Sequence, residues 1–265
     1  MILWDLCKKN GRKTWEGVGM RGNVPEDMLL REASLYMTGK LLKDFLCPDL
    51  DFYGCEDDFF DWIWKLVCEC HEKGFRIKAD VLTCPDFSAG KSFVEFSDGS
   101  CAKKSPVTEE ELKDYFYYRH ICCRERKPDH GIAGGMLLLE KLQGDLGKCA
   151  EIYFYAATTL MCHNVFGQSM AAKKCSVQEN PLLCLLLLSE ALEPLHLCEE
   201  NADWNNAQKF LRAVQVEKQG DSLIVTVDPE IIPFELYTEK LVTTAKKTGI
   251  RVSVGQKSNN IHIRV

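Results

Sequence analysis

Three of the six histidines, His120, His130 and His163, lie in the apolar middle section of the chain. Asp129 precedes the second of them and Asn164 follows the third. A buried imidazole needs a hydrogen-bonding partner or a metal ion, because leaving a polar group unpaired in the core costs free energy. Taken singly, such a histidine is more often a hydrogen-bonded core residue than a ligand.

Two carboxylates strengthen the case for a site. Glu190 and Glu193 interrupt a leucine-rich stretch three residues apart, and this spacing places them on one face of a helix. Imidazoles and carboxylates that project from different helices into a bundle core are the usual way such folds build metal sites. The combination indicates a divalent metal site, and a purely structural polar network is the alternative.

Hydrophobic periodicity predicts the helices that must position these residues. Apolar positions three and four apart predict helices over 27–37 and 59–68, the second beginning at Asp57 or Asp58 and ending near Gly74. Thr108 and Glu111 form a capping-box pattern that begins a helix with His120 near its end. Further helices are predicted over 130–142, 149–166 and 181–198, and the last two are apolar nearly all round, as in the centre of a bundle.

Glycines mark one of these helices. Gly131, Gly134 and Gly135 lie on one side of the helix over 130–142 and would let another backbone approach closely. Glycine costs a helix about 1 kcal/mol per residue relative to alanine, so close packing is the expected compensation.

The hydrophobic period changes from 3.6 to 2 after residue 201. Strands are predicted over 211–217 and 222–227 around a turn at Gly220, then a helix over 233–247 ended by Gly249, then strands over 250–254 and 260–265. The fold class is therefore mainly α, a helical bundle with a small α+β C-terminal ββαββ module. We expect a helical domain over 1–205, with an irregular insertion at about 75–105, and the module over 206–265.

Composition limits the classes of function. The chain has 265 residues, 46% of them hydrophobic, and a net charge of -6, which argues against a general surface for duplex nucleic acid. The densest apolar run, 182–188, falls far short of the ~20 residues of a membrane helix. The N-terminus has no secretory signal pattern, so we expect a cytoplasmic protein whose 14 cysteines are reduced.

One cysteine motif offers a different site. Cys68, Cys70 and His71 are soft ligands, but they lie too close in sequence for one tetrahedral zinc site without a distant second pair. Cys122 and Cys123 are the available pair. A zinc-stabilised, cysteine-rich interaction domain is therefore a further hypothesis.

Three segments together resemble a known family. They are Arg124–Gly135, the string His163-Asn-Val-Phe166, and Pro181–Pro194 with its Leu-Ser-Glu-Ala-Leu-Glu-Pro ending. In order and placement on helices they are similar to the core of the HD superfamily of metal-dependent phosphohydrolases, over about residues 108–200. The adjacent His-Asp pair that names that family is absent from this sequence: Ile121 follows His120, and Asp129 precedes His130.

The resemblance implies a site and its chemistry. In that family, histidines on successive helices and a late aspartate hold one or two divalent metals, which bind a phosphate and activate water. Glu190 stands at the position of the aspartate. The implied metal ligands are His120, His130, His163 and Glu190, holding Mn, Fe, Ni, Mg or Zn. The implied catalytic residues are Arg124, Arg126 and Lys127, which would hold the substrate phosphate, and Asp129, a general base or further ligand.

Two functions from different classes follow. The first is a metal-dependent phosphohydrolase that acts on a nucleotide or another small phosphoester. The second is a catalytically degenerate bundle that binds a nucleotide or a protein partner in signalling. In both cases we expect neither duplex nucleic acid nor a membrane as a partner.

Overall fold

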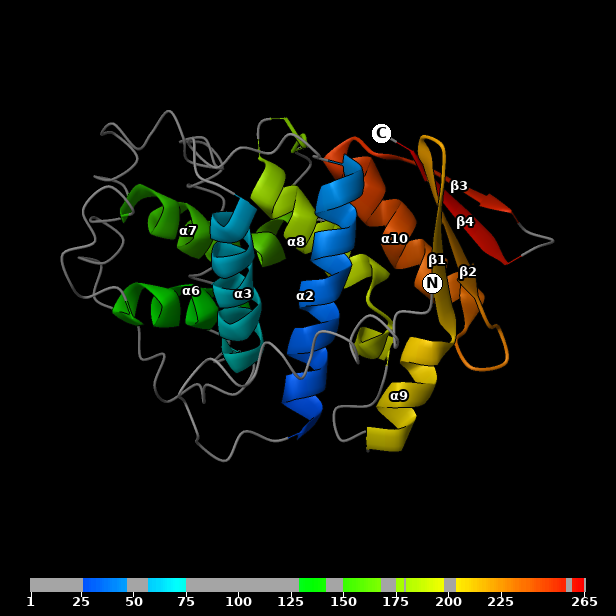
Figure 1. Cartoon of the computed structure of the whole chain (residues 1–265), viewed down its shortest axis with the longest axis horizontal. Coiled ribbons are helices and arrows are strands. Elements are labelled where there is room, and N and C mark those ends of the chain that lie inside the picture. The colour runs from blue at the N-terminus through cyan, green and yellow to red at the C-terminus, as the bar shows by residue number, and fades with distance from the viewer. Residues whose placement is uncertain are drawn as a thin grey trace. The chain divides into compact units, whose positions relative to one another are not determined.

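A computed structural model describes residues 26–46, 57–74, 129–141, 150–167, 175–178, 180–197, 204–255 and 259–264. Helices make up most of these residues, and a four-stranded antiparallel sheet lies near the C-terminus (Figure 1). The predicted class, mainly helical with a small C-terminal β module, is confirmed. The predicted insertion at about 75–105 and the predicted helix that carries His120 lie outside the described residues.

The chain divides into two compact units. We call residues 51–173 the histidine unit, and residues 1–50 together with 174–265 the sheet unit. The sheet unit contains the C-terminal module together with residues 1–50 and 174–205. Its bounds therefore differ from the division at 205/206 expected from the sequence. That division stays a prediction.

The histidine unit contains α3 (Asp57–Gly74), α6 (His130–Lys141) and α7 (Ala150–Gly167). All three coincide with predicted helices to within a residue or two. The helix α6 packs against both α3 and α7, and α3 also touches α7. Ile63 and Trp64 of α3 are completely buried, as the apolar face of an amphipathic helix should be.

Glycines allow α6 to lie unusually close to its neighbours. A Cβ atom on Gly134 would lie 2.5 Å from the carbonyl oxygen of Cys70 in α3, and one on Gly135 would lie 2.7 Å from that of Ala157 in α7. Real Cβ atoms essentially never come so near, so these positions require glycine. The predicted close approach of backbones at this helix is confirmed.

The sheet unit has α8 (Pro181–Leu192) as its core, because ten of its residues are buried. This helix packs against α2 (Glu26–Leu46) on one side and α10 (Phe234–Thr248) on another. The predicted helix over 181–198 is wrong at its end. Glu193 has an extended backbone (φ -74°, ψ 119°), because the following Pro194 disfavours helical geometry, and a short 3-10 turn, η3 (Pro194–Leu197), follows.

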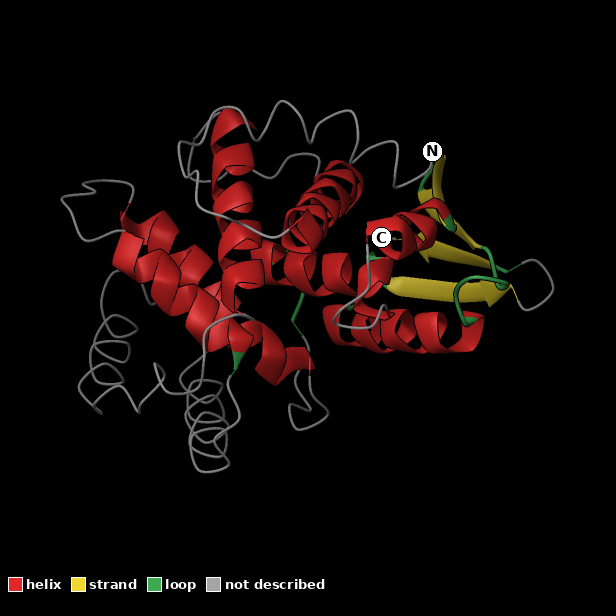
Figure 2. Ribbon diagram, turned by 90° about the horizontal axis from the view of Figure 1, so that it is seen from below, coloured by secondary structure: helices red, strands yellow, loops and turns green. Residues whose placement is uncertain are grey.

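The sheet contains β1 (Val214–Gln219), β2 (Ser222–Val227), β3 (Arg251–Gly255) and β4 (Asn260–Arg264) in the order β1-β2-β4-β3. Helix α10 lies along one face of the sheet (Figure 2). The predicted ββαββ order is confirmed. The predicted start of the first strand is wrong, because Leu211 belongs to a preceding helix, α9 (Trp204–Arg212).

Turn chemistry explains two of the boundaries in this module. Gly220 (φ 56°) and Gly249 (φ 72°) adopt the left-handed backbone conformation that glycine tolerates best. The first closes the β1–β2 turn and the second ends α10, as the sequence predicts.

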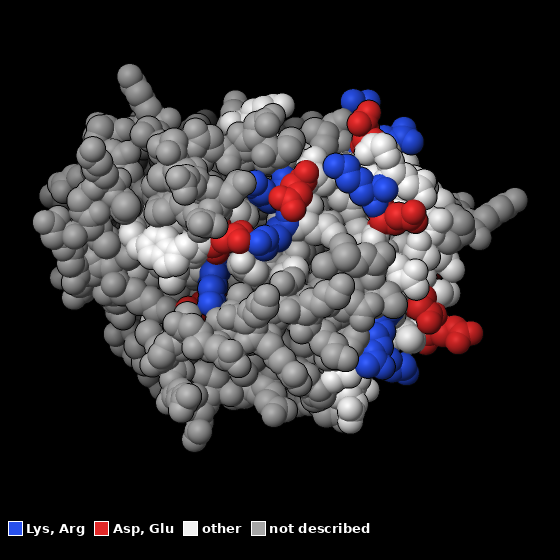
Figure 3. Space-filling view, viewed as in Figure 1, with Lys and Arg blue, Asp and Glu red and all other residues white. Residues whose placement is uncertain are grey.

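Acidic and basic side chains of the described residues are interspersed on the face seen in Figure 3, and charges of one sign do not gather there. None of the described helices is both long enough and apolar enough to cross a membrane.

Candidate metal centre

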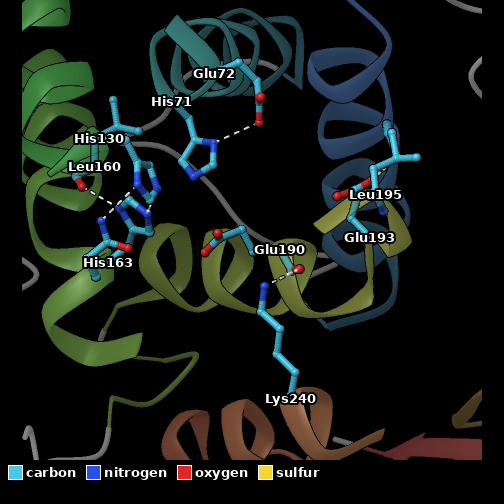
Figure 4. A network of polar contacts seen from close by, with 11 residues as sticks. His71, Glu72, His130, Leu160, His163, Glu190, Glu193, Leu195 and Lys240 are labelled. Atoms are coloured by element: carbon cyan, nitrogen blue, oxygen red, sulfur yellow. Dashed lines mark hydrogen bonds and ion pairs between the residues drawn. The ribbon is translucent and has the colours of Figure 1, made fainter. Parts of the chain in front are cut away.

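Three histidines from three helices meet inside the histidine unit. His71 lies near the end of α3, His130 is the first residue of α6, and His163 lies near the end of α7. Their ring centroids are 4.8 to 4.9 Å apart in every pairing, and the rings turn toward one another (Figure 4). His163 is completely buried, His71 is 2% exposed, and His130 is half-buried.

A backbone carbonyl orients His163. Its Nδ1 lies 2.6 Å from the carbonyl oxygen of Leu160, and because a carbonyl only accepts hydrogen bonds, Nδ1 carries the proton. The other ring nitrogen, Nε2, therefore carries the lone pair. It lies 2.9 Å from Nε2 of His130.

A carboxylate orients His71 in the same way. Its Nδ1 lies 3.1 Å from Oε1 of Glu72, and both side chains are buried. A histidine that donates its Nδ1 proton to a carboxylate and offers Nε2 is typical of metal sites, because the carboxylate holds the ring in one tautomer and makes it more basic. Glu72 is thus placed to support His71.

Asp129 has two roles at the start of α6. Its Oδ1 accepts a hydrogen bond from the backbone N–H of Ile132 (2.9 Å), which caps the helix, and another from Nδ2 of Asn164 (3.0 Å). The same Asn164 Nδ2 lies 3.3 Å from Nδ1 of His130. Oδ2 of Asp129 is buried, and no described residue makes a hydrogen bond to it.

The glycine packing also makes room for the imidazoles. A Cβ atom on Gly131 would collide with the backbone carbonyl of Leu160 and with the ring of His163. The absence of a side chain at this position therefore lets α7 bring its histidine beside the first turn of α6. The same feature that packs the helices creates the cluster.

The donor set is suitable for a transition metal. The candidate ligand nitrogens lie within 4.8 Å of one another. A tetrahedral ion with bonds of about 2.0–2.1 Å to imidazole places its ligand nitrogens roughly 3.3 Å apart, so small side-chain shifts would bring all three into range. Three histidines can hold an ion and leave a position for water or substrate. The buried cluster can therefore bind a divalent metal.

The structure brings together two of the four metal ligands expected from the sequence, His130 and His163. His120 and the predicted phosphate-binding residues Arg124, Arg126 and Lys127 lie outside the described residues. Glu190 is a half-buried residue of α8 in the sheet unit, where its backbone carbonyl accepts a hydrogen bond of 3.2 Å from Lys240 Nζ. Its role as a ligand stays a prediction.

Glu193, the second glutamate of the leucine-rich stretch, makes hydrogen bonds that stabilise the fold. Its Oε1 accepts hydrogen bonds from the backbone N–H of Leu195 (2.8 Å) and from Ser34 Oγ (3.2 Å). These bonds hold the extended turn after α8 and fasten it to α2.

Sequence reasoning did not place His71 in this cluster. It read His71 only with Cys68 and Cys70 as a soft-ligand motif, whereas both cysteines are buried in the core and neither belongs to the cluster. The available signal was the pair His71-Glu72, a histidine directly followed by an acid at the end of an amphipathic helix.

Comparisons of the chain with protein-family models, with curated proteins and with solved structures find no match.

Proposed function

We propose that the protein is a metal-dependent phosphohydrolase that acts on a nucleotide or another small phosphoester. The observation that carries the proposal is the convergence of three imidazoles from three helices, two of them buried and that of His130 half-buried. The outward nitrogens of His71 and His163 are bonded to oxygen acceptors. This arrangement turns their Nε2 lone pairs toward a shared centre. A polar core network needs no such convergence.

The pair His71-Glu72 supports the likeness to HD phosphohydrolases. We propose that it takes the place of the adjacent His-Asp pair that names the family, with a carboxylate one methylene longer. In this chain Glu72 Oε1 acts as the hydrogen-bond acceptor for His71 Nδ1, so its contribution is to orient a ligand.

The roles of the other residues follow from their chemistry. A divalent ion bound here would lower the pKa of a coordinated water toward about 7. His71, His130 and His163 would hold it, and Glu190 is the carboxylate proposed to join them. Oδ1 of Asp129 caps α6, and its buried Oδ2 is the atom that would accept a proton or act as a further metal ligand.

One observation favours the second candidate function, a degenerate bundle that binds a nucleotide or a protein partner. Nε2 of His130 and Nε2 of His163 are 2.9 Å apart, which is a hydrogen-bonding distance, so the two rings can satisfy each other in a site without an ion. The two functions therefore differ in metal content.

Metal content is the decisive experiment. Protein purified without chelator is analysed by elemental mass spectrometry beside His71→Ala, His130→Ala and His163→Ala, with His196→Ala of the sheet unit as the matched control. Stoichiometric metal in the parent and in the control, lost in the three cluster variants, supports the proposal and justifies a screen of nucleotides for phosphate release. Folded protein that takes up no metal from Mn, Fe, Ni or Zn would favour the degenerate bundle.

A further inference from the structure

The hydrogen bonds on the two sides of the His130 ring show which of its nitrogens donates and which accepts. They can be assigned starting from His163 or starting from Asp129. Next to His163, the Leu160 carbonyl accepts the Nδ1 proton of that ring, so in the neutral imidazole His163 Nε2 can only accept. The nitrogen 2.9 Å away, His130 Nε2, must then be the donor. Assigned from His163, His130 therefore carries its proton on Nε2.

The contacts of Asp129 and Asn164 give the same His130 tautomer independently. Asp129 Oδ1 can only accept, so the side chain of Asn164 must present its NH₂ group to it. That same NH₂ group lies 3.3 Å from His130 Nδ1, which must therefore be an acceptor. A neutral imidazole with an accepting Nδ1 has its proton on Nε2, as the first argument requires.

We infer that Asp129 and Asn164 set the tautomer of His130 and, through it, the metal affinity of the cluster. Asn164 is the positioning residue, because its amide contacts the ring, and Asp129 determines which way that amide faces. A nitrogen that carries a proton cannot ligate a metal, so His130 Nε2 is closed to an ion in this arrangement. This consequence for metal binding rests on the proposed function, whereas the tautomer itself does not.

Metal binding through His130 Nε2 requires the ring to change its tautomer. For His130 to ligate through Nε2, its proton must move to Nδ1, where the Asn164 NH₂ group now points. A second donor there is unfavourable, so the amide must turn its oxygen toward the ring, and it then loses its bond to Asp129. Residues that orient metal-binding histidines typically change metal affinity about 10–100-fold, and we expect an effect of this size.

Exchanging the side chains of residues 129 and 164 should reverse the donor and acceptor roles of these hydrogen bonds. In the double variant Asp129→Asn with Asn164→Asp, the charge and the atom count of the pair are unchanged. Asparagine is as good a helix cap as aspartate, so its carbonyl can still accept from Ile132 N–H while its NH₂ group donates to the carboxylate introduced at position 164. That carboxylate can only accept, and it therefore favours a proton on His130 Nδ1.

The tautomers are read by long-range ¹H–¹⁵N NMR of the imidazoles in metal-free protein at pH 8. We expect the Nε2–H tautomer of His130 in the parent and the Nδ1–H tautomer in the exchanged variant. Asn164→Ala, which removes the donor and adds no acceptor, should give a mixture. An Nδ1–H tautomer in the parent would overturn the inference even if the exchanged variant failed to fold, and so would an exchanged variant that folds with the parent's tautomer.

Zinc titration then separates the two proposals. The exchanged variant should bind Zn²⁺ about 10-fold or more tightly than the parent, because its His130 already has the ligating tautomer. Equal affinity in the two proteins would refute the link between tautomer and metal. Absence of zinc binding in both would refute the proposed function, while the NMR result would still decide the tautomer.

Discussion

His163 in the histidine unit and His196 in the sheet unit begin from the same local arrangement. Each directs Nδ1 at a backbone carbonyl three residues earlier, that of Leu160 in the first case and that of Glu193 in the second. Their remaining nitrogens have different surroundings. His163 Nε2 meets another histidine, whereas the His196 ring stacks on Tyr237 with centroids 6.5 Å apart.

The difference shows what distinguishes a candidate ligand from a structural histidine. Burial first, and then the positive charge of Lys240, lower the pKa of His196 from 6.5 to about 4, so the ring stays neutral. Its neighbour Tyr237 donates a hydrogen bond to the carbonyl of Leu192 at the end of α8. The local hydrogen bond is shared, so the arrangement of other helices around the second nitrogen decides the role.

The largest expected difference is in metal binding. His163→Ala should weaken metal binding by more than about 100-fold, because deleting a ligand should exceed the 10–100-fold effect typical of residues that only orient ligands. His196→Ala should leave the affinity unchanged. Isothermal titration with Zn²⁺ measures both, and circular dichroism checks the fold. Equal losses in the two variants would mean that the histidines do not differ in the way proposed.

Two buried glutamates sharpen the same contrast. Glu72→Ala should reduce metal affinity about 10–100-fold, because His71 loses the acceptor that orients it. Glu193→Ala should instead destabilise the protein by about 1–3 kcal/mol, because Leu195 N–H and Ser34 lose their acceptor. Zinc titration and urea unfolding separate the effects. Reduced affinity in Glu193→Ala with no change in stability would contradict this assignment.

Glycines in the two units should also respond differently. Gly134→Ala should cost about 1–3 kcal/mol, because the added methyl group meets the Cys70 backbone and α6 must move away from α3. Gly220→Ala has open space, and its cost of roughly 1–2 kcal/mol comes from the left-handed backbone alone. Urea unfolding measures both. Only the first should also weaken zinc binding, and an unchanged affinity would separate helix packing from the cluster.

The last contrast concerns the pH dependence of stability. His196 is neutral in the folded protein, and Lys240 and Arg31 oppose its protonation while Glu190 favours it. Because the unfolded chain binds this proton more readily, stability is fully present above about 6.5 and is lost as the pH falls toward about 4. His196→Gln should reduce that slope by less than about 1.4 kcal/mol per pH unit in urea unfolding between pH 7 and pH 4. An identical slope in parent and variant would contradict the assigned pKa.

Several elements could be predicted because their signals are local. Helical periodicity located α3, the nearly all-apolar stretch over 149–166 located α7, and the glycine turns located the β1–β2 hairpin and the end of α10. The errors came where a single residue overrides a longer pattern. Pro194 ends α8 before the apolar pattern does, and α9 extends into a stretch that alternates like a strand.

Only part of the candidate site was predictable. His130 and His163 were identified because each is a polar residue in an apolar helix with a polar neighbour. His71 was not, because its two neighbouring cysteines suggested a thiolate motif, and nothing in the spacing indicates that α3 packs against α6. The glycines predicted that some backbone approaches α6, but they could not identify it as that of Cys70.

Local patterns in the chain were enough to predict the described helices of the histidine unit and the order of the ββαββ module. They also identified two of the three clustered histidines. These features depend on periodicity, caps and turns within a short stretch. Helix packing was needed to show that His71 joins them, that Glu72 orients it, and that Asp129 and Asn164 act together on His130. Residues 129 and 164 are far apart in the chain, and a hydrogen bond between them forms only when α6 and α7 pack. The direction of a proton network depends on which acceptors meet which rings, and packing alone brings them together.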